Sequence, residues 1–319
     1  MSVLVTGGAG YIGSHVARML QKRGDKVVVV DNVSSGVVER IGDAKLIRLD
    51  LSAPNAVEVL TAAIKENGIE SVIHLAAQKQ VGVSVLEPEF YYHQNITGMI
   101  NLLTAMRATG VDRLVFSSSA AAYGMPDVSM VTEDIACSPI NPYGETKLIG
   151  EWMARDASRA WGLRLANLRY FNVAGAGWTD LADTAVMNLV PIVFAAIKGG
   201  TKPKVFGDDY ETVDGTCVRD YVHISDLAEA HLSALDYLDN DVREFDTFNV
   251  GTGKGSSVLE VLDEIRKVSG IEFEHIIEER RAGDPPSLCA DVSRINKTLG
   301  WKAKNGLHEI VASAWEAQL

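Results

Sequence analysis

A short apolar run, a glycine-rich loop and a helical pattern follow one another at the start of the chain, and this order constrains the fold more than any other feature. The run Val3–Thr6 leads directly into Gly7-Gly8-Ala9-Gly10-Tyr11-Ile12-Gly13. Apolar residues then recur at helical spacing from Ile12 to Leu20, and Gly24 follows at a position typical of a left-handed helix cap. The sequence therefore predicts a strand, a tight loop and a helix that begins at the loop.

The same alternation continues over the first 170 residues. Short runs, most of them continuously hydrophobic, are separated by segments with helical patterning, as is typical of strands covered by helices on both faces. The runs are Val3–Thr6, Lys26–Val30, Lys45–Leu49, Ser71–Leu75, Arg113–Ser117 and Leu163–Leu168. The pattern predicts an α/β fold with a Rossmann-type, doubly wound parallel sheet.

The glycine loop and the acid that follows it predict a dinucleotide site. Gly7 permits a tight turn, Gly10 lets the backbone approach a pyrophosphate, and Gly13 lets the helix pack close to the sheet. Asp31 ends the second run, 18 residues after Gly13, where a carboxylate can hold both hydroxyls of an adenosine ribose. Because Asp31 would repel a 2′-phosphate and no Arg follows in residues 32–35, the sequence favours NAD over NADP.

Composition excludes several other classes of protein. The chain has 30 Lys and Arg against 42 Asp and Glu, a net charge of −12, so nucleic acid is a poor ligand. Cys137, Cys217 and Cys289 form no disulfide or zinc pattern, and we expect no metal site. The amino terminus lacks the features of a signal peptide, and the longest apolar stretch, Met187–Ile197, is too short to cross a membrane. We expect a cytoplasmic protein.

Three polar residues downstream of the predicted dinucleotide loop form a candidate catalytic centre. Tyr143 and Lys147 are four residues apart, which places a phenol and an ammonium on one face of the helix that Pro142 helps to start. A nearby cation and a positive nicotinamide ring both favour the phenolate, so Tyr143 could accept a proton from a sugar hydroxyl. Ser119, just past the strand at 113–117, could hydrogen-bond the reacting oxygen.

These residues resemble the extended short-chain dehydrogenase/reductase superfamily and, within it, the UDP-glucose 4-epimerases. The resemblance runs nearly from end to end of the chain. It rests on Thr6 to His15, Ala77 to Gly82, Phe116 to Gly124, Tyr143 to Lys147, Arg169 to Asn172, Val205 to Tyr210, Asp214 to His223, and Arg281-Ala282-Gly283-Asp284. The last three segments belong to the part of the family that binds the nucleotide sugar.

The resemblance implies a reaction and two domains. Residues 1–169 would bind NAD, and residues 170–319, a smaller mixed α/β domain, would bind a UDP-hexose, with some segments returning to the first sheet. Tyr143 would take the proton of the sugar 4-hydroxyl during oxidation at carbon 4, and the 4-keto sugar would turn over and be reduced on its other face. Ser119 would share the proton path, while Lys147 would bind the nicotinamide ribose and tune Tyr143.

The resemblance also assigns binding residues by position. The cofactor set is Gly7, Gly10, Tyr11, Ile12, Gly13, Asp31, Asn32, Asp50, Leu51, Ala76, Lys79, Asn95, Tyr143, Lys147 and Tyr170. The substrate set is Lys79, Ser119, Tyr143, Asn172, Asn188, Val205, Phe206, Arg219, Tyr221, Arg281, Asp284 and Leu288. Family members are commonly homodimers, and here the helices around Asn95–Ala108 and Tyr143–Ala160 would form the interface.

Several assigned residues have a simpler structural interpretation. Arg219 stands next to Asp220 and could form an ion pair with it, and Arg281 could lie on a solvated charged edge. Phe206 could belong to the core, and Lys79 could be a surface lysine. These alternatives stay open at the level of sequence.

Other functions on the same fold are also open. Enzymes that dehydrate a 4-keto nucleotide sugar carry an acid just after the Ser/Thr position, whereas Ser119 is followed by Ala120-Ala121-Ala122. An epimerase of another UDP sugar (an N-acetylhexosamine, a pentose or a uronate) is the main alternative. The resemblance implies that side-chain bulk at the position of Leu288 decides whether acetylated sugars fit, and leucine is intermediate in size. We expect weak or no activity on UDP-N-acetylglucosamine.

Two features depart from the family pattern: Cys217 stands where the family usually has Gly, and the segment 175–188 is short. A non-catalytic NAD-sensing regulator would have lost Tyr143 or Lys147.

Overall fold

The chain divides into two compact units, and the computed structural model describes residues 1–240, 245–281 and 283–319. The first unit comprises residues 1–124, 137–169 and 228–248, and the second comprises 125–136, 170–227 and 249–319. Residues 125–136 therefore group with the second unit although they lie within the predicted first domain. The functional names given to the two domains stay predictions.

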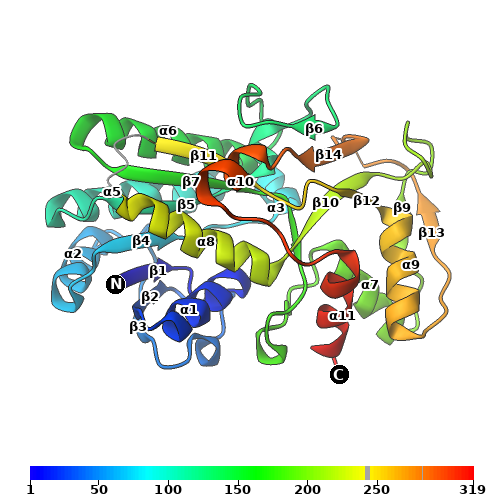
Figure 1. Cartoon of the computed structure of the whole chain (residues 1–319), viewed down its shortest axis with the longest axis horizontal. Helices are drawn as coiled ribbons and strands as arrows, with labels where there is room; N and C mark the ends of the chain where they lie inside the picture. The colour runs from blue at the N-terminus through cyan, green and yellow to red at the C-terminus, as the bar shows by residue number, and fades with distance from the viewer. Residues whose placement is uncertain (241–244, 282) are drawn as a thin grey trace. The chain divides into compact units, whose positions relative to one another are not determined.

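A seven-stranded sheet forms the centre of the first unit (Figure 1). Its order is β11-β7-β5-β4-β1-β2-β3, and the pairs from β3 through β2, β1 and β4 to β5 are parallel. The strands are β1 Ser2–Thr6, β2 Lys26–Asp31, β3 Lys45–Arg48, β4 Ser71–His74, β5 Arg113–Ser119, β7 Arg164–Tyr170 and β11 Phe245–Val250. The first six coincide with the predicted apolar runs, so the α/β prediction is confirmed.

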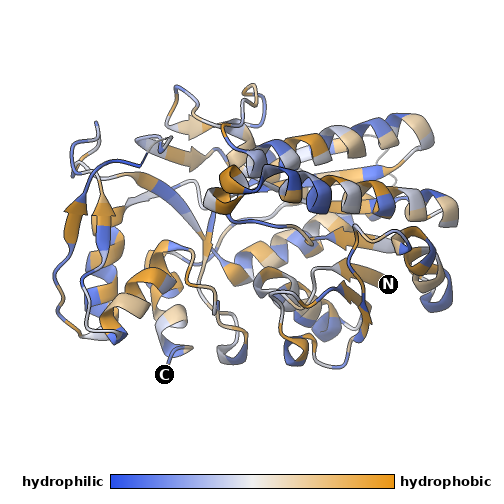
Figure 2. Cartoon of the chain, turned by 180° about the vertical axis from the view of Figure 1, so that it is seen from behind, coloured by the Kyte–Doolittle hydropathy of each residue, from blue (hydrophilic) through white to orange (hydrophobic). Residues whose placement is uncertain are grey.

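Helices cover both faces of this sheet, which explains why its strands are hydrophobic on both sides. Helices α1 and α8 lie on the face nearer the viewer in Figure 1, and α5 and α6 lie on the face seen from behind in Figure 2. The helices are α1 Tyr11–Arg23, α2 Ala56–Asn67, α3 Val81–Leu86, α4 Pro88–Tyr92, α5 Gly98–Thr109, α6 Pro142–Trp161 and α8 Ile224–Asp239, with short turns η1 Val38–Ile41, η2 His93–Thr97 and η3 Ala120–Tyr123.

The two helices that carry predicted functional residues begin and end where the sequence indicates. Helix α1 ends at Gly24, which has a φ of +92° and caps the last turn through its backbone N–H. Helix α6 begins at Pro142, and the Asn141 side chain before it accepts the N–H of Gly144 at 2.9 Å. The starting point of α6 is therefore determined locally, and with it the position of Tyr143 in the first turn.

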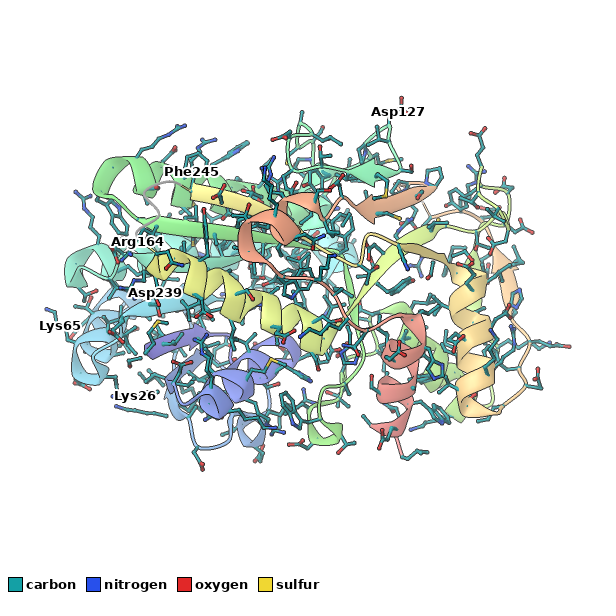
Figure 3. All side chains as sticks on the ribbon, viewed as in Figure 1. Lys26, Lys65, Asp127, Arg164, Asp239 and Phe245 are labelled. Atoms are coloured by element: carbon teal, nitrogen blue, oxygen red, sulfur yellow. The ribbon has the colours of Figure 1, made fainter. Side chains whose placement is uncertain are left out.

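Ion pairs gather at the amino end of the first unit's sheet. Lys26, Arg164 and Phe245, which begin β2, β7 and β11, are labelled at this end in Figure 3. Arg164 donates to both carboxylate oxygens of Asp112 at 2.7 and 2.9 Å. The carboxyl ends of the strands carry instead the loops that contain Gly7, Gly10, Asp50, Ala76 and Lys79.

The second unit is built around a smaller mixed sheet. Strand β10 pairs antiparallel with β12 and parallel with β14 and β8, and β14 pairs with β6. Strands β9 and β13 form a separate two-stranded sheet. The strands are β6 Met130–Val131, β8 Asn172–Ala174, β9 Lys204–Phe206, β10 Val218–His223, β12 Gly255–Ser257, β13 Ile276–Glu278 and β14 Ser287–Ala290. The helices are α7 Leu189–Lys198, α9 Val258–Ser269, α10 Ser293–Leu299 and α11 Leu307–Glu316, with the short turn η4 Thr179–Leu181, and the apolar faces of α7, α9 and α11 form a core of this unit. The predicted mixed α/β character is confirmed.

Candidate active site

The glycine loop lies between β1 and α1, where the strand order of the sheet reverses. Gly7 has a φ of +71°, and a Cβ on it would lie 2.7 Å from the backbone nitrogen of Ala76, which follows β4. A Cβ on Gly13 would lie 2.1 Å from the carbonyl oxygen of Gly7. Gly13 thus lets α1 pack against the glycine loop. The sequence analysis expected Gly13 to let the helix pack against the sheet.

The amino end of α1 fits the pyrophosphate of a dinucleotide. Gly10 precedes the helix in an extended conformation, and no side chain caps its first turn. Backbone N–H groups and the positive end of the helix dipole favour an anion at such a position. Because a Cβ at Gly7 or Gly13 would fill the turn, the residues present fit the group that the sequence predicts.

Asp31 ties the end of β2 to the glycine loop. Its carboxylate accepts the N–H of Ala9 at 3.0 Å and the N–H of Val33 at 2.7 Å, and the residue is buried. Asn32 accepts the N–H of Ser34 at 3.0 Å. A carboxylate oxygen can accept more than one hydrogen bond, so Asp31 can still receive ribose hydroxyls.

The other predicted cofactor residues follow strands of the same sheet. Asp50 and Leu51 come after β3, where the Asp50 carboxylate accepts the N–H and O–H of Ser52, both at 2.8 Å. Burial raises the pKa of Asp50, but the hydrogen bonds from Ser52 and Gln94 outweigh it and leave the pKa below its usual value. Lys79 is exposed on the segment after β4.

Asn95 lies in the π-helical turn before α5 and joins two elements through its amide. Its Oδ1 accepts the N–H of Gln78 at 2.8 Å, and its Nδ2 donates to the carbonyl of Gln78 at 3.1 Å and to Oγ1 of Thr146 at 2.9 Å. Asn95 therefore fixes the segment that carries Lys79 to the helix that carries Tyr143. The geometry gives it a positioning role for the site.

Tyr143, Ser119 and Lys147 come together where α6 packs on the end of β5. The Tyr143 phenol is hydrogen-bonded to the Ser119 hydroxyl, whose oxygen also accepts the N–H of Ala121 at 3.2 Å. The Lys147 ammonium donates to the carbonyl of Ser117 at 2.7 Å and lies 5.9 Å from the centre of the Tyr143 ring. The arrangement can pass a proton between a ligand, a phenol and a hydroxyl.

Burial governs the charge of both groups on α6. It raises the pKa of Tyr143 above the ordinary phenol value, and the hydrogen bond from Ser119 acts in the opposite direction. Burial also lowers the pKa of Lys147 to about 7, against the charge of Glu151. The sequence analysis expected Lys147 to favour the phenolate, but within the protein alone desolvation is stronger, so the phenolate needs further positive charge.

In the second unit, two predicted substrate residues form an ion pair. Arg219 donates to Asp284 at 3.3 Å and to the carbonyls of Val218 and Pro285, both at 2.8 Å. The Arg219–Asp220 ion pair considered from sequence is wrong. Asp220 accepts instead the N–H and O–H of Thr252, the N–H of Gly253 and the N–H of Ala290.

Arg281 and Phe206 form a second contact in this unit. The Arg281 guanidinium lies 3.8 Å from the centre of the Phe206 ring, a cation–π geometry that leaves the edge of the guanidinium to other partners. Arg280, its neighbour, stacks on Tyr210 at 4.2 Å and pairs with Asp209 at 2.6 Å. Arg281 is exposed, as the solvated-edge interpretation expects, but its guanidinium is also stacked on Phe206. Ala282 of the same motif lies outside the described residues.

The remaining predicted residues are distributed over several elements. Leu288 on β14 pairs with Arg219 on β10, and Tyr221 on β10 pairs with Asn172 on β8. Val205 is buried in β9, and burial raises the pKa of the Tyr221 phenol. Tyr170 is the buried last residue of β7, whereas Asn188 is exposed at the start of α7 and reaches Asp183 at 3.4 Å.

Sequence reasoning missed a buried ion pair beside the predicted catalytic residues. Glu151 of α6 pairs with Arg169 of β7, and Ser118 of β5 donates to the same carboxylate. The signal was present, because Glu151 stands four residues after Lys147 and eight after Tyr143. An acid at that spacing lies on the same face of the helix.

Two further findings concern other kinds of site. In the part of the chain that the structure describes, no cluster of His, Cys, Asp and Glu side chains could hold a metal ion. The described helices include none with the length and apolar character needed to cross a membrane.

Comparisons with known proteins agree with this geometry. The profile of the NAD dependent epimerase/dehydratase family matches residues 3–251. A UDP-glucose 4-epimerase from Lactobacillus helveticus is 44% identical over 322 aligned residues, which cover 99% of this chain and 96% of that protein.

Solved structures are similar over the whole chain. A UDP-glucose 4-epimerase from Stenotrophomonas maltophila, with bound NAD and formylated UDP-arabinopyranose, is 40% identical with a TM-score of 0.94, and the match covers 100% of this chain and 98% of that one. A UDP-Glc/GlcNAc 4-epimerase from Campylobacter jejuni is 39% identical with a TM-score of 0.87, covering 99% and 98%.

Replacing Asp31 by Asn should weaken the discrimination between the two dinucleotides. The substitution keeps the size of the side chain but removes the charge that repels a 2′-phosphate, so the ratio of the NADP and NAD dissociation constants should fall about tenfold or more. Calorimetric titration of cofactor-stripped protein measures both constants. Asp43→Asn, an exposed acid in the same half of the unit, is the matched control, and an unchanged ratio in Asp31→Asn would contradict the role of Asp31.

Proposed function

The chain belongs to the NAD dependent epimerase/dehydratase family, and we propose that it catalyses the NAD-dependent interconversion of UDP-galactose and UDP-glucose. The observation that carries the proposal is the joint placement of Tyr143, Ser119 and Lys147 at the carboxyl end of β5. The UDP-glucose 4-epimerase from Lactobacillus helveticus, similar over nearly the whole chain, supports the reaction.

Proton transfer through Tyr143 is the chemical contribution of the protein. The Tyr143 phenolate takes the proton of the sugar 4-hydroxyl, and the same phenol returns it when the 4-keto sugar is reduced on its other face. Ser119 shares the proton path, because its single hydroxyl proton can pass to Tyr143 or to the sugar oxygen. Bound NAD supplies the acceptor and then the donor of the hydride at carbon 4.

Charge explains how Tyr143 can act as a base. The Lys147 ammonium and an oxidised, positive nicotinamide ring both stabilise the phenolate, and the same burial that raises the pKa of Tyr143 strengthens these interactions. Tyr143 would therefore be more readily deprotonated beside an oxidised nicotinamide than beside a reduced one. Proton transfer and oxidation are thereby coupled.

We assign binding of the UDP group to the arginines of the second unit. Arg219 commits three N–H contacts to Val218, Pro285 and Asp284, and these hold its guanidinium in one orientation with N–H groups to spare. A guanidinium fixed in this way can bind phosphate oxygens at little entropic cost. Firm binding of UDP lets the 4-keto sugar turn over without leaving the enzyme.

Elimination of water is the less favoured chemistry on this scaffold. The residues after Ser119 form the short turn η3, made of Ala120, Ala121, Ala122 and Tyr123. None of them carries a carboxyl group that could protonate a leaving hydroxyl. The alternative of a dehydratase therefore lacks its acid at the position where the family places it.

Tyr143→Phe should lose about 10²–10⁴-fold in turnover while it retains NAD and UDP binding, because the change removes proton transfer and little affinity. The assay follows UDP-glucose formation from UDP-galactose without added cofactor, and fluorescence titration follows UDP. Tyr237→Phe, which removes a phenol hydrogen-bonded to Asp246 elsewhere in the first unit, should keep normal turnover. Near-normal turnover of Tyr143→Phe would disprove the role of Tyr143, and a wild-type protein inactive on UDP-galactose would disprove the proposed reaction.

Leu288 should make the enzyme prefer plain over acetylated sugars. We expect the kcat/KM for UDP-galactose to exceed that for UDP-N-acetylgalactosamine by about tenfold or more, because the leucine restricts the space for an acetamido group. Leu288→Ser should lower this ratio and Leu288→Tyr should raise it. Comparable turnover of both sugars by the wild-type protein would contradict the gate and would favour the dual specificity named for the Campylobacter jejuni relative.

We also propose that the protein is a homodimer that associates through α5 and α6. Ile100 on α5 and Trp152 on α6 are 49% and 47% exposed, and the two helices pack side by side on the outside of the first unit (Figure 2). Large apolar side chains exposed on neighbouring helices are typical of an interface. The predicted cytoplasmic location stays a prediction.

Trp152→Glu should convert the dimer to a monomer, because it places a charge in an apolar contact. Light scattering coupled to size-exclusion chromatography measures the mass. Lys22→Glu, at an exposed position of α1 on the opposite face of the sheet, is the control and should leave the mass unchanged. A wild-type protein that is monomeric at micromolar concentration would rule out the proposed interface.

A further inference from the structure

Three consecutive residues of β5 hold three residues of α6 that are each one helical turn apart. Ser119 is hydrogen-bonded to Tyr143, the carbonyl of Ser117 accepts the Lys147 ammonium, and the hydroxyl of Ser118 donates to Glu151. Tyr143, Lys147 and Glu151 stand at positions i, i+4 and i+8 of the helix. Glu151 therefore belongs to the same contact surface as the two residues assigned to the reaction.

The third contact of this row is a buried ion pair. Arg169 donates to Glu151 from Nε at 2.8 Å and from its terminal nitrogen at 2.6 Å, and each side chain is 7% exposed. The Arg169 guanidinium also lies 4.7 Å from the centre of the Tyr123 ring. With Ser118 added, the carboxylate of Glu151 is held from β5 and β7 in a single orientation.

Lys147 has few ways to compensate for its burial. Its ammonium donates to one carbonyl and lies 5.4 Å from the centre of the Phe116 ring. Burial lowers the pKa of Lys147, and the charge of Glu151 acts against that shift. A buried cation needs a nearby anion to stay charged.

We propose that Glu151 is a positioning residue for the reaction: locked by Arg169 and Ser118, it fixes α6 on β5 so that Lys147 lies next to Tyr143, and it places a negative charge one helical turn from the ammonium. This inference rests on the roles proposed above for Tyr143 and Lys147. A buried ion pair can often be replaced by apolar residues without loss of stability, so stability alone does not explain why Glu151 and Arg169 are present. A role in the chemistry does explain it.

Of the charged groups around Lys147, Glu151 is the one whose charge can be removed without changing Tyr143 or Lys147 themselves. On α6, the Lys147 ammonium lies 5.9 Å from the centre of the Tyr143 ring and one helical turn from Glu151. His74 on β4 is also near Lys147, and burial lowers the pKa of His74 to about 3, so its ring stays neutral. Arg169 on β7 stays positive, and the Cys137 thiol beside the pair has its pKa raised by burial. His74, Cys137 and Arg169 therefore keep their charge across neutral pH.

The test compares the pH dependence of Glu151→Gln with that of the wild-type holoenzyme. Loss of the negative charge, and the unpaired Arg169 that remains, both disfavour the protonated ammonium. The alkaline limb of the kcat profile should therefore move down by on the order of one pH unit. Nitrogen-detected NMR of lysine-labelled protein, with the signal assigned by its absence in Lys147→Met, should show the same downward move in the titration of Lys147.

Two further variants separate charge from structure. Ser118→Ala removes a hydrogen bond from the same carboxylate but keeps the charge, so the alkaline limb and the NMR titration should stay in place even if turnover falls. If Glu151→Gln does not fold, Glu151→Gln with Arg169→Gln removes both buried charges together, and the limb should still move down, because Glu151 is one turn from Lys147 on the same helix.

An unchanged NMR titration of Lys147 in the folded Glu151 variants would overturn the proposal and leave the pair with a structural role. The proposal also fails if Ser118→Ala moves the titration as far as Glu151→Gln does. The NMR titration needs no substrate, so it tests the role of Glu151 even if the proposed epimerase reaction fails. Failure of the reaction itself would appear in the wild-type assay alone.

Discussion

The burial of the Lys147 ammonium is the constraint on which the rest of the site depends. A lysine without hydration tends to lose its proton, and an uncharged amine next to Tyr143 would do nothing to stabilise a phenolate. The fold meets this constraint by packing α6 against β5 so closely that a Cβ on Gly150 would lie 2.5 Å from the Phe116 ring. That approach brings the Ser117 carbonyl to the ammonium and Ser119 to the phenol. The chemistry therefore depends on a helix–strand contact more than on any single residue.

Topology explains why predicted site residues that are distant in sequence come to one edge of the sheet. Gly7, Asp31, Asp50, Ala76 and Ser119 each lie at or just after the carboxyl end of a strand of the same sheet. In a doubly wound sheet these ends face the crevice at the reversal of strand order, and here the reversal falls between β1 and β4. The close approach of Gly7 to Ala76 joins the two loops at that point, and any side chain larger than hydrogen would push them apart.

Local signals made much of this predictable. The apolar runs gave the strands because buried parallel strands are hydrophobic on both faces, and Gly24 and Pro142 gave helix limits because their backbone preferences act within one turn. Contacts made by packing were not predictable in the same way. The pairing of Glu151 with Arg169 joins a helix to a strand, and the dominance of burial over the charge of Lys147 depends on how completely the site excludes water.

The position of Arg219 shows how elementary geometry limits such predictions. Neighbouring residues of a strand point to opposite faces, so Arg219 and Asp220 within β10 do not form the ion pair that their adjacency in the sequence suggested. The strand directs Asp220 to the N–H groups of Thr252, Gly253 and Ala290, and it directs Arg219 to Asp284. Because the buried carboxylate is satisfied by these donors, the guanidinium on the other face keeps N–H groups for a phosphate. The alternation of one strand thus separates a structural acid from the arginine that we propose binds phosphate.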